Sequence, residues 1–144
     1  MTVPSVLSLG VLVDGEPYVG LLPFAATPDF GGLFIHASGL ALHTRGLLPG
    51  APFSALIHEP EQSGVDPLQL PRVTFQGKVQ LLEQGSLEYG QASQIYQSRF
   101  PESARTFLLG DFHLYRLQIS RGRLVAGFAR TININTDHLA GLAG

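Results

Sequence analysis

LFIHASGLALHTRG (residues 33–46) joins two sequence patterns. The run LFIHA is apolar apart from His36 and predicts a strand. From Ser38 onward the pattern becomes helical, and Pro49-Gly50 ends it. A strand that leads into a helix start can offer free backbone N–H groups and the positive end of the helix dipole to an anion. The stretch therefore favours two interpretations: a phosphate-binding turn, or an ordinary helix that Ser38 caps.

Polar side chains inside this stretch support the anion-binding interpretation. Ser38 and Thr44 supply hydroxyl donors, and Arg45 supplies a cation of fixed geometry. His43 donates through one ring nitrogen. Residue spacing alone still favours the capped helix, because capping by itself explains a serine at a helix start.

Outside this stretch the chain is dominated by strand patterns. The predicted strands are SVLSLGVLV (5–13), EPYVGLLPF (16–24), PFSALIHE (52–59), RVTFQGKVQLLE (72–83), DFHLYRLQI (111–119) and RLVAGFARTINI (123–134). Asp14-Gly15 between two apolar runs predicts a hairpin. Gly77 and Gly127, each inside a predicted strand, indicate a bulge or a close backbone approach. The segment 120–122 predicts a tight turn between the last two strands.

Two helical insertions interrupt the strands. Residues 86–98 predict a helix with Ser86 as N-cap, and ESARTFLLG (102–110) predicts a shorter one closed by Gly110. Residues 59–71 are polar and rich in proline, which is typical of a surface loop. About seven strands with short turns and few helices predict a small antiparallel barrel.

Composition limits the classes of function. A chain of 144 residues predicts a single domain over residues 1–144. The absence of cysteine excludes disulfides, a thiolate metal site and a cysteine nucleophile. Charged residues make up only 14%, with a net charge of −2, and no basic patch indicates nucleic acid. No signal peptide or membrane span is visible, so a cytoplasmic location is expected. The low charge leaves apolar surface that an obligate dimer would cover.

Motifs for catalysis and metal binding are missing. The five histidines show no metal-ligand spacing, so no metal site is expected. Thr136, Asp137 and His138 supply triad residue types, but no GxSxG elbow accompanies them. Rossmann and P-loop motifs are also absent. No catalytic residue is identified, and His36 is only a weak candidate acid or base.

Six segments in sequence order nevertheless resemble a known family: GEPYVGLLPF, LFIHASGLALHTRGLL, FSALIHEP, RVTFQG, GDFHLYRL and VAGFAR. Together they cover roughly residues 8–130 and resemble the pyridoxamine 5′-phosphate oxidase-like FMN-binding split-barrel proteins, most closely the branch that includes haem-utilisation proteins. The resemblance implies a mainly β fold: an antiparallel split β-barrel of six or seven strands. It also implies a homodimer with FMN at the interface.

The resemblance assigns residues to the flavin. Ser38, His43 and Thr44, with Arg45 beside them, fall where the family contacts the FMN phosphate. The residues expected along the isoalloxazine ring are Val19, Gly20, Leu21, Leu22, Ile35 and His36, and Gln76 is expected at the ring or the ribityl chain. Gly20, Gly39 and Gly46 stand where the branch usually carries polar side chains.

Three functions follow as expectations. The first is an FMN-dependent oxidoreductase in which flavin N5 accepts or gives a hydride, with its substrate undefined. The second is a haem-binding or haem-handling protein of the same branch. The third is a dimeric binding protein without a cofactor, which the three glycines suggest.

Overall fold

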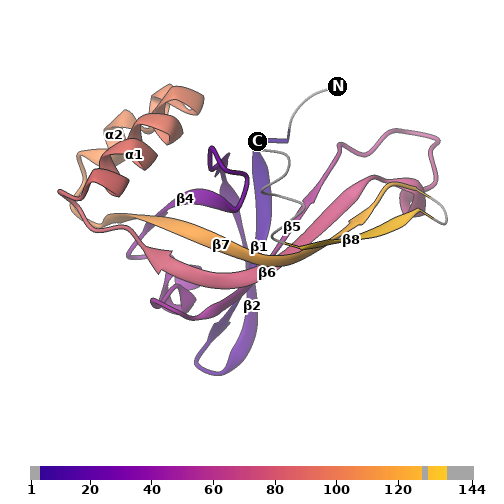
Figure 1. The fold of residues 1–144 in the computed structure, drawn as a ribbon, viewed down its shortest axis with the longest axis horizontal. Helices are drawn as coiled ribbons and strands as arrows, with labels where there is room; N and C mark the ends of the chain where they lie inside the picture. Colours follow the sequence, from indigo (N-terminus) through magenta and orange to yellow (C-terminus); the bar gives the residue numbers. More distant parts are fainter. Residues whose placement is uncertain (1–3, 128–129, 136–144) are drawn as a thin grey trace.

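The computed structural model describes residues 4–127 and 130–135, which form one antiparallel sheet with short helices at one end (Figure 1). The strands are β1 (Val6–Val13), β2 (Glu16–Pro23), β3 (Ala25–Ala26), β4 (Gly32–Ser38), β5 (Pro52–His58), β6 (Arg72–Leu81), β7 (Phe112–Val125) and β8 (Thr131–Asn135). The strand order is β2-β1-β5-β6-β7-β4-β3, and β8 pairs with β7. The predicted mainly β, antiparallel fold is confirmed.

The sheet curls so that its two ends come close together without pairing. β2 is the first strand in the sheet order, yet it lies close to β4 near the other end. In the described part of the chain no hydrogen-bonded ladder joins these two strands. This leaves an open seam along the barrel between β2 and β4.

Alternation of side chains creates the barrel core. Leu7, Leu9 and Val11 on β1 point inward and are almost fully buried, as expected for the inward face of a strand with period two. β4 differs, because six of its seven residues are buried. Ile35 faces the barrel core, whereas Phe34 belongs to a second cluster beneath the helices.

The helices cover the second face of β4. α1 (Leu87–Arg99) begins where the Ser86 hydroxyl accepts a hydrogen bond from the Tyr89 N–H, so the predicted N-cap is confirmed. A short connection follows, made of η3 (Pro101–Ser103) and α2 (Ala104–Phe107). In Figure 1 these helices lie at one end of the long antiparallel pair β6–β7. The loop after β5, with η2 (Pro67–Gln69), lies at the other end.

Two predicted backbone features are confirmed. Asp14 and Gly15 have φ values of 53° and 81° and close the β1–β2 hairpin. The β6–β7 register shifts between Gln76 and Gly77, which is the predicted bulge. A Cβ on Gly77 would lie 1.8 Å from the carbonyl oxygen of Gln118, so only glycine fits there.

The predicted turn at 120–122 is wrong. β7 runs without a break through this segment, and Gly122 pairs with Phe75 of β6. A Cβ on Gly122 would lie 2.8 Å from the Phe75 ring, so this glycine makes room for an aromatic side chain and closes no turn.

Gly127 also differs from the prediction. It has a φ of 106° and follows the end of β7, so it lies in the connection to β8 and in neither strand. Residues 136–138, with the triad residue types, lie outside the described residues.

Candidate functional site

A pocket of about 370 Å³ opens at the seam between β2 and β4. We call it the seam pocket; its wall includes Leu22, His36, Ser38, His43, Tyr96 and Phe112. The first four are predicted site residues, brought together from β2, β4 and η1 (Leu42–Gly46). The helical insertion contributes Tyr96, Phe100 and Thr106, which sequence reasoning did not place in a site.

His36 is a buried titratable side chain of the seam pocket. It is 6% exposed, and its ring stacks on Phe107 with 3.8 Å between ring centroids. Nδ1 lies 3.3 Å from the Thr106 hydroxyl, whereas Nε2 is buried without a hydrogen-bond partner. Burial lowers the pKa of His36 to about 4, and the nearby His113 adds to this effect, so the imidazole is neutral near pH 7.

His43 is the second imidazole at the seam pocket. Its Nε2 is also buried without a partner, and burial lowers its pKa. The ring packs against Gly20 of β2, where a Cβ would lie 2.7 Å from Nδ1. Gly20 is therefore required for the position of His43.

Gly39 and Gly46 also have packing roles. A Cβ on Gly46 would lie 2.7 Å from the Leu12 carbonyl oxygen, and one on Gly39 would lie 3.1 Å from the Asp111 carbonyl oxygen. Close approach of a neighbouring backbone therefore explains these two glycines, whereas Gly20 makes room for the His43 side chain.

The segment after β4 is not the predicted helix. Ser38 belongs to β4, and only the five residues of η1 are helical, in the 3₁₀ form. Ala41 occupies the N-cap position without a side-chain hydrogen bond. The expectation of a helix dipole at Ser38 is wrong, because Ser38 instead accepts a hydrogen bond from the Leu40 N–H in a local turn.

The predicted anion donors already have partners within the chain. The Thr44 hydroxyl donates to the Ser38 carbonyl oxygen at 2.6 Å, and the Ser38 hydroxyl donates to the Asp111 carboxylate at 3.3 Å. Arg45 forms two hydrogen bonds to the Asp14 carboxylate, at 2.9 and 3.0 Å, on the exposed surface. A phosphate at this place would compete with these contacts and would lie close to the Asp111 charge.

The remaining predicted residues lie elsewhere. Val19 and Leu21 alternate with Gly20 and Leu22, so they point to the opposite, outer face of β2, where they are 65% and 67% exposed. Ile35 has no exposed surface, so its side chain reaches no ligand in this conformation.

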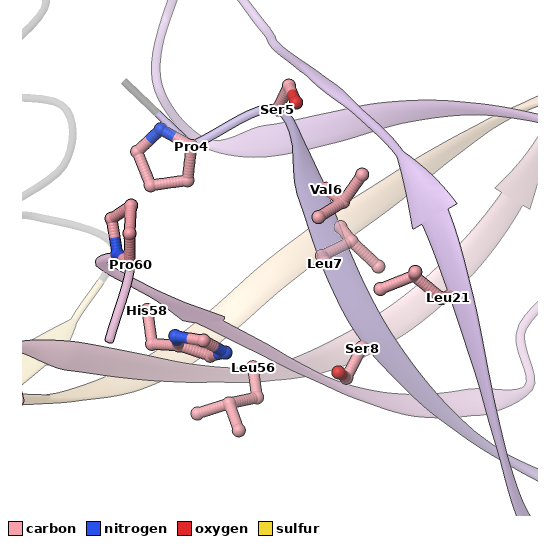
Figure 2. A pocket seen from close by; sticks show the side chains of 9 residues that line it. All are labelled: Pro4, Ser5, Val6, Leu7, Ser8, Leu21, Leu56, His58 and Pro60. Carbon is pink, nitrogen blue, oxygen red and sulfur yellow. The ribbon is translucent and has the colours of Figure 1, made fainter. Parts of the chain in front are cut away.

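Two hollows lie on the outer face. One, of about 330 Å³, is lined in part by Val19 and Gln76. The Gln76 side chain accepts a hydrogen bond from Arg121 at 2.7 Å. Figure 2 shows the other, of about 280 Å³, where Leu21 lies near side chains of β1 and β5 such as Leu56. Within a single chain, the predicted flavin contacts are therefore split between the seam pocket and the outer face.

Two classes of site are missing from residues 4–127 and 130–135. No group of three or more histidine or carboxylate side chains is placed to hold a metal ion. No helix is long and apolar enough to cross a membrane.

Comparisons with known proteins find similar proteins that are described as haem proteins. No protein-family model matches the chain. HutZ of Vibrio cholerae serotype O1, described as a haem oxygenase, is 29% identical over 127 residues, which cover 88% of this chain and 71% of HutZ. A crystal structure of V. cholerae HutZ, described as a haem storage protein, matches with a TM-score of 0.71 at 28% identity over 81% of this chain and 82% of that one.

Proteins of lower sequence identity share the fold. A haem-binding protein from Mycobacterium smegmatis matches with a TM-score of 0.84 at 24% identity over 96% of this chain, and the chain spans 55% of that protein. A second M. smegmatis protein, which binds FAD and haem, matches with a TM-score of 0.66 at 15% identity over 98% of this chain and 73% of that one. The chain therefore has the split-barrel fold that the sequence predicts, and similar proteins include both haem and flavin binders.

Proposed function

We propose that this protein binds haem at the seam pocket and serves in haem handling. The observation that carries the proposal is a pair of buried imidazole nitrogens, on His36 and His43, that have no partner at a mostly apolar pocket. Leaving a buried polar atom unpaired is costly, so such atoms suggest a ligand. The sequence relationship to HutZ points to the same ligand class.

The chemistry of the pocket residues fits haem. Phe100, Phe112 and Tyr96 supply aromatic surface for a flat, apolar macrocycle. His36 and His43 have lowered pKa values, and a neutral imidazole is the form that ligates iron. Bound haem would supply iron chemistry, and the chain would supply binding and orientation.

A haemin titration tests the proposal. The protein is titrated with haemin and, as the matched control, with iron-free protoporphyrin IX. A saturable Soret shift with haemin at micromolar concentration, with weaker binding of protoporphyrin IX, is expected. If neither compound binds saturably, the proposal is wrong.

Flavin binding remains a second candidate, on the outer face. Val19 and Leu21 are exposed apolar residues on the edge strand β2, and Gln76 lies in the hollow next to Val19. An edge strand with exposed apolar residues is a surface that proteins usually cover. We propose that a second copy of the chain covers it and that FMN would lie between the two copies, where it could support oxidoreductase chemistry.

Light scattering and an FMN titration test this second candidate. A dimer that Leu21→Lys converts to a monomer would place the interface on the outer face. Saturable FMN binding by the wild type that this variant loses would place the flavin there. A monomeric wild type that leaves FMN unbound would exclude it.

A further inference from the structure

The hydrogen bonds around Thr106 fix the proton of His36. The Thr106 hydroxyl donates to the Ser103 carbonyl oxygen at 2.8 Å, so its hydrogen is already used. Its oxygen lies 3.3 Å from Nδ1 of His36 and accepts from it. A neutral imidazole carries one N–H, so Nδ1 is protonated and Nε2 of His36 carries a free lone pair.

The ring of His36 is also held in orientation. Phe107 stacks on it with 13° between the ring planes, and Tyr96 and Phe112 pack around it at centroid distances of 5.8 and 5.1 Å. A neutral imidazole whose Nδ1–H donates to an oxygen and whose Nε2 is free is the arrangement found in metal-ligating histidines. His36 thus has both the tautomer and the fixed orientation of such a ligand.

The surroundings favour haem iron over a free metal ion. No group of three ligating side chains forms among the described residues, so a free ion would lack protein ligands. Haem iron needs only one or two ligands from the protein, because the macrocycle fills the other positions. His43 is less suitable than His36, since no contact fixes which of its nitrogens carries the proton.

The covering of His36 indicates how iron would approach. Nε2 is shielded from solvent, and the stacked Phe107 and the bonded Thr106 both belong to α2. Because these two contacts set the tautomer and orientation of His36, α2 has to stay against β4 for the imidazole to act as a ligand. The seam pocket, which His36 lines, is therefore the side from which iron would approach.

We propose that Nε2 of His36 is the protein's ligand to haem iron, approached from the seam pocket, which His36 lines, while α2 stays against β4. The inference rests on the proposed haem binding and adds the ligand. Coordination forms one dative bond from the Nε2 lone pair to iron, with no change in the oxidation state of the iron. His36 keeps its Nδ1 proton, which Thr106 continues to accept as a hydrogen bond.

The test compares variants by haemin titration and resonance Raman spectroscopy of the ferrous complex. The wild type is expected to show an iron–histidine stretching band. His36→Ala should lose this band and bind haemin more weakly than the wild type. Added imidazole should restore the band in this variant, a result that a merely structural role for His36 would not give.

Three further variants complete the test. Thr106→Val removes the acceptor at Nδ1 and should shift the iron–histidine band to lower frequency while the protein remains folded. His58→Ala, which removes an exposed histidine elsewhere, should keep the band, and His43→Ala tests whether the other imidazole of the pocket supplies the ligand instead.

The outcomes separate the two proposals. Haemin binding with an unchanged band in His36→Ala overturns the ligand and leaves haem binding standing. A band lost only in His43→Ala overturns it as well. A wild type that binds no haemin overturns the proposed function, and the ligand with it. Circular dichroism and the thermal midpoint establish that each variant is folded.

Discussion

The two faces of β2 differ in what they offer a ligand. On the inner face, Gly20 and Leu22 border the seam pocket, where the Nε2 atoms of two neutral imidazoles have no hydrogen-bond partner among the described residues. On the outer face, Val19 and Leu21 are exposed on an edge strand beside shallow hollows. The inner face has unsatisfied polar atoms in an apolar setting, which suits a ligand that binds through one strong contact. The outer face has apolar area, which suits a second protein chain.

The largest expected effect is a pH dependence of the unfolding free energy, which comes from His36 on the inner face. The pKa of His36 lies at about 4 in the folded protein, below the 6.5 that is usual for histidine, because the ring is buried. The unfolded chain therefore takes up a proton more readily than the folded one, and His36 favours folding fully above pH 6.5. This contribution, roughly 3 kcal/mol, is lost as the pH falls from 6.5 to about 4.

Urea unfolding at a series of pH values measures this effect. His36→Leu, which introduces an apolar side chain of similar size, should reduce the dependence between pH 6.5 and 4. His43, whose pKa burial also lowers, should retain the remainder. His58→Leu, at an exposed position, should leave it in place. A dependence of the same size in His36→Leu would mean that His36 is not the group responsible.

The next effect separates the two faces directly. Gly20→Ala places a methyl group 2.7 Å from Nδ1 of His43, so the imidazole must move. We expect a loss of about 1–3 kcal/mol in unfolding free energy and weaker haemin binding. Val19→Ala, one residue away on the outer face, should change stability by less than about 0.5 kcal/mol and leave haemin binding unchanged. Equal effects from both variants would contradict the distinction between the faces.

The smallest effect concerns the stretch that first suggested an anion site. Arg45 forms its ion pair with Asp14 at the surface, so Arg45→Ala should lower the unfolding free energy by only about 0.2–1 kcal/mol. Haemin binding should not change. An FMN titration of the same variant checks the sequence-based alternative, in which loss of a charged hydrogen bond to phosphate weakens FMN binding by about 1.5–3 kcal/mol.

The strands were predictable because their patterns are local. Alternating apolar residues in β1 and the Asp14-Gly15 turn define the first hairpin without reference to the rest of the chain. Gly122 shows where this reasoning fails. The sequence presents it as a turn residue, and it makes room for a Phe75 ring that is distant in the sequence. Whether a glycine serves a turn or a close approach depends on tertiary packing.

The site was predictable only in part for the same reason. The resemblance placed His36, Ser38 and His43 near one ligand, and the structure brings them to one pocket. It could not indicate that α2 would lie over His36, because that contact joins segments 70 residues apart. It also treated Gly20 as a lost polar contact, whereas the structure shows that Gly20 makes room for the His43 ring.

The most direct test of haem binding at the inner face is an NMR spectrum with ferric haemin bound, because the paramagnetic iron broadens signals of nearby residues. The account predicts that signals of His36, Tyr96 and Phe112 disappear while those of Val19 and Leu21 persist. Loss of the Val19 and Leu21 signals with the His36 signals retained would place haem on the outer face and contradict the account.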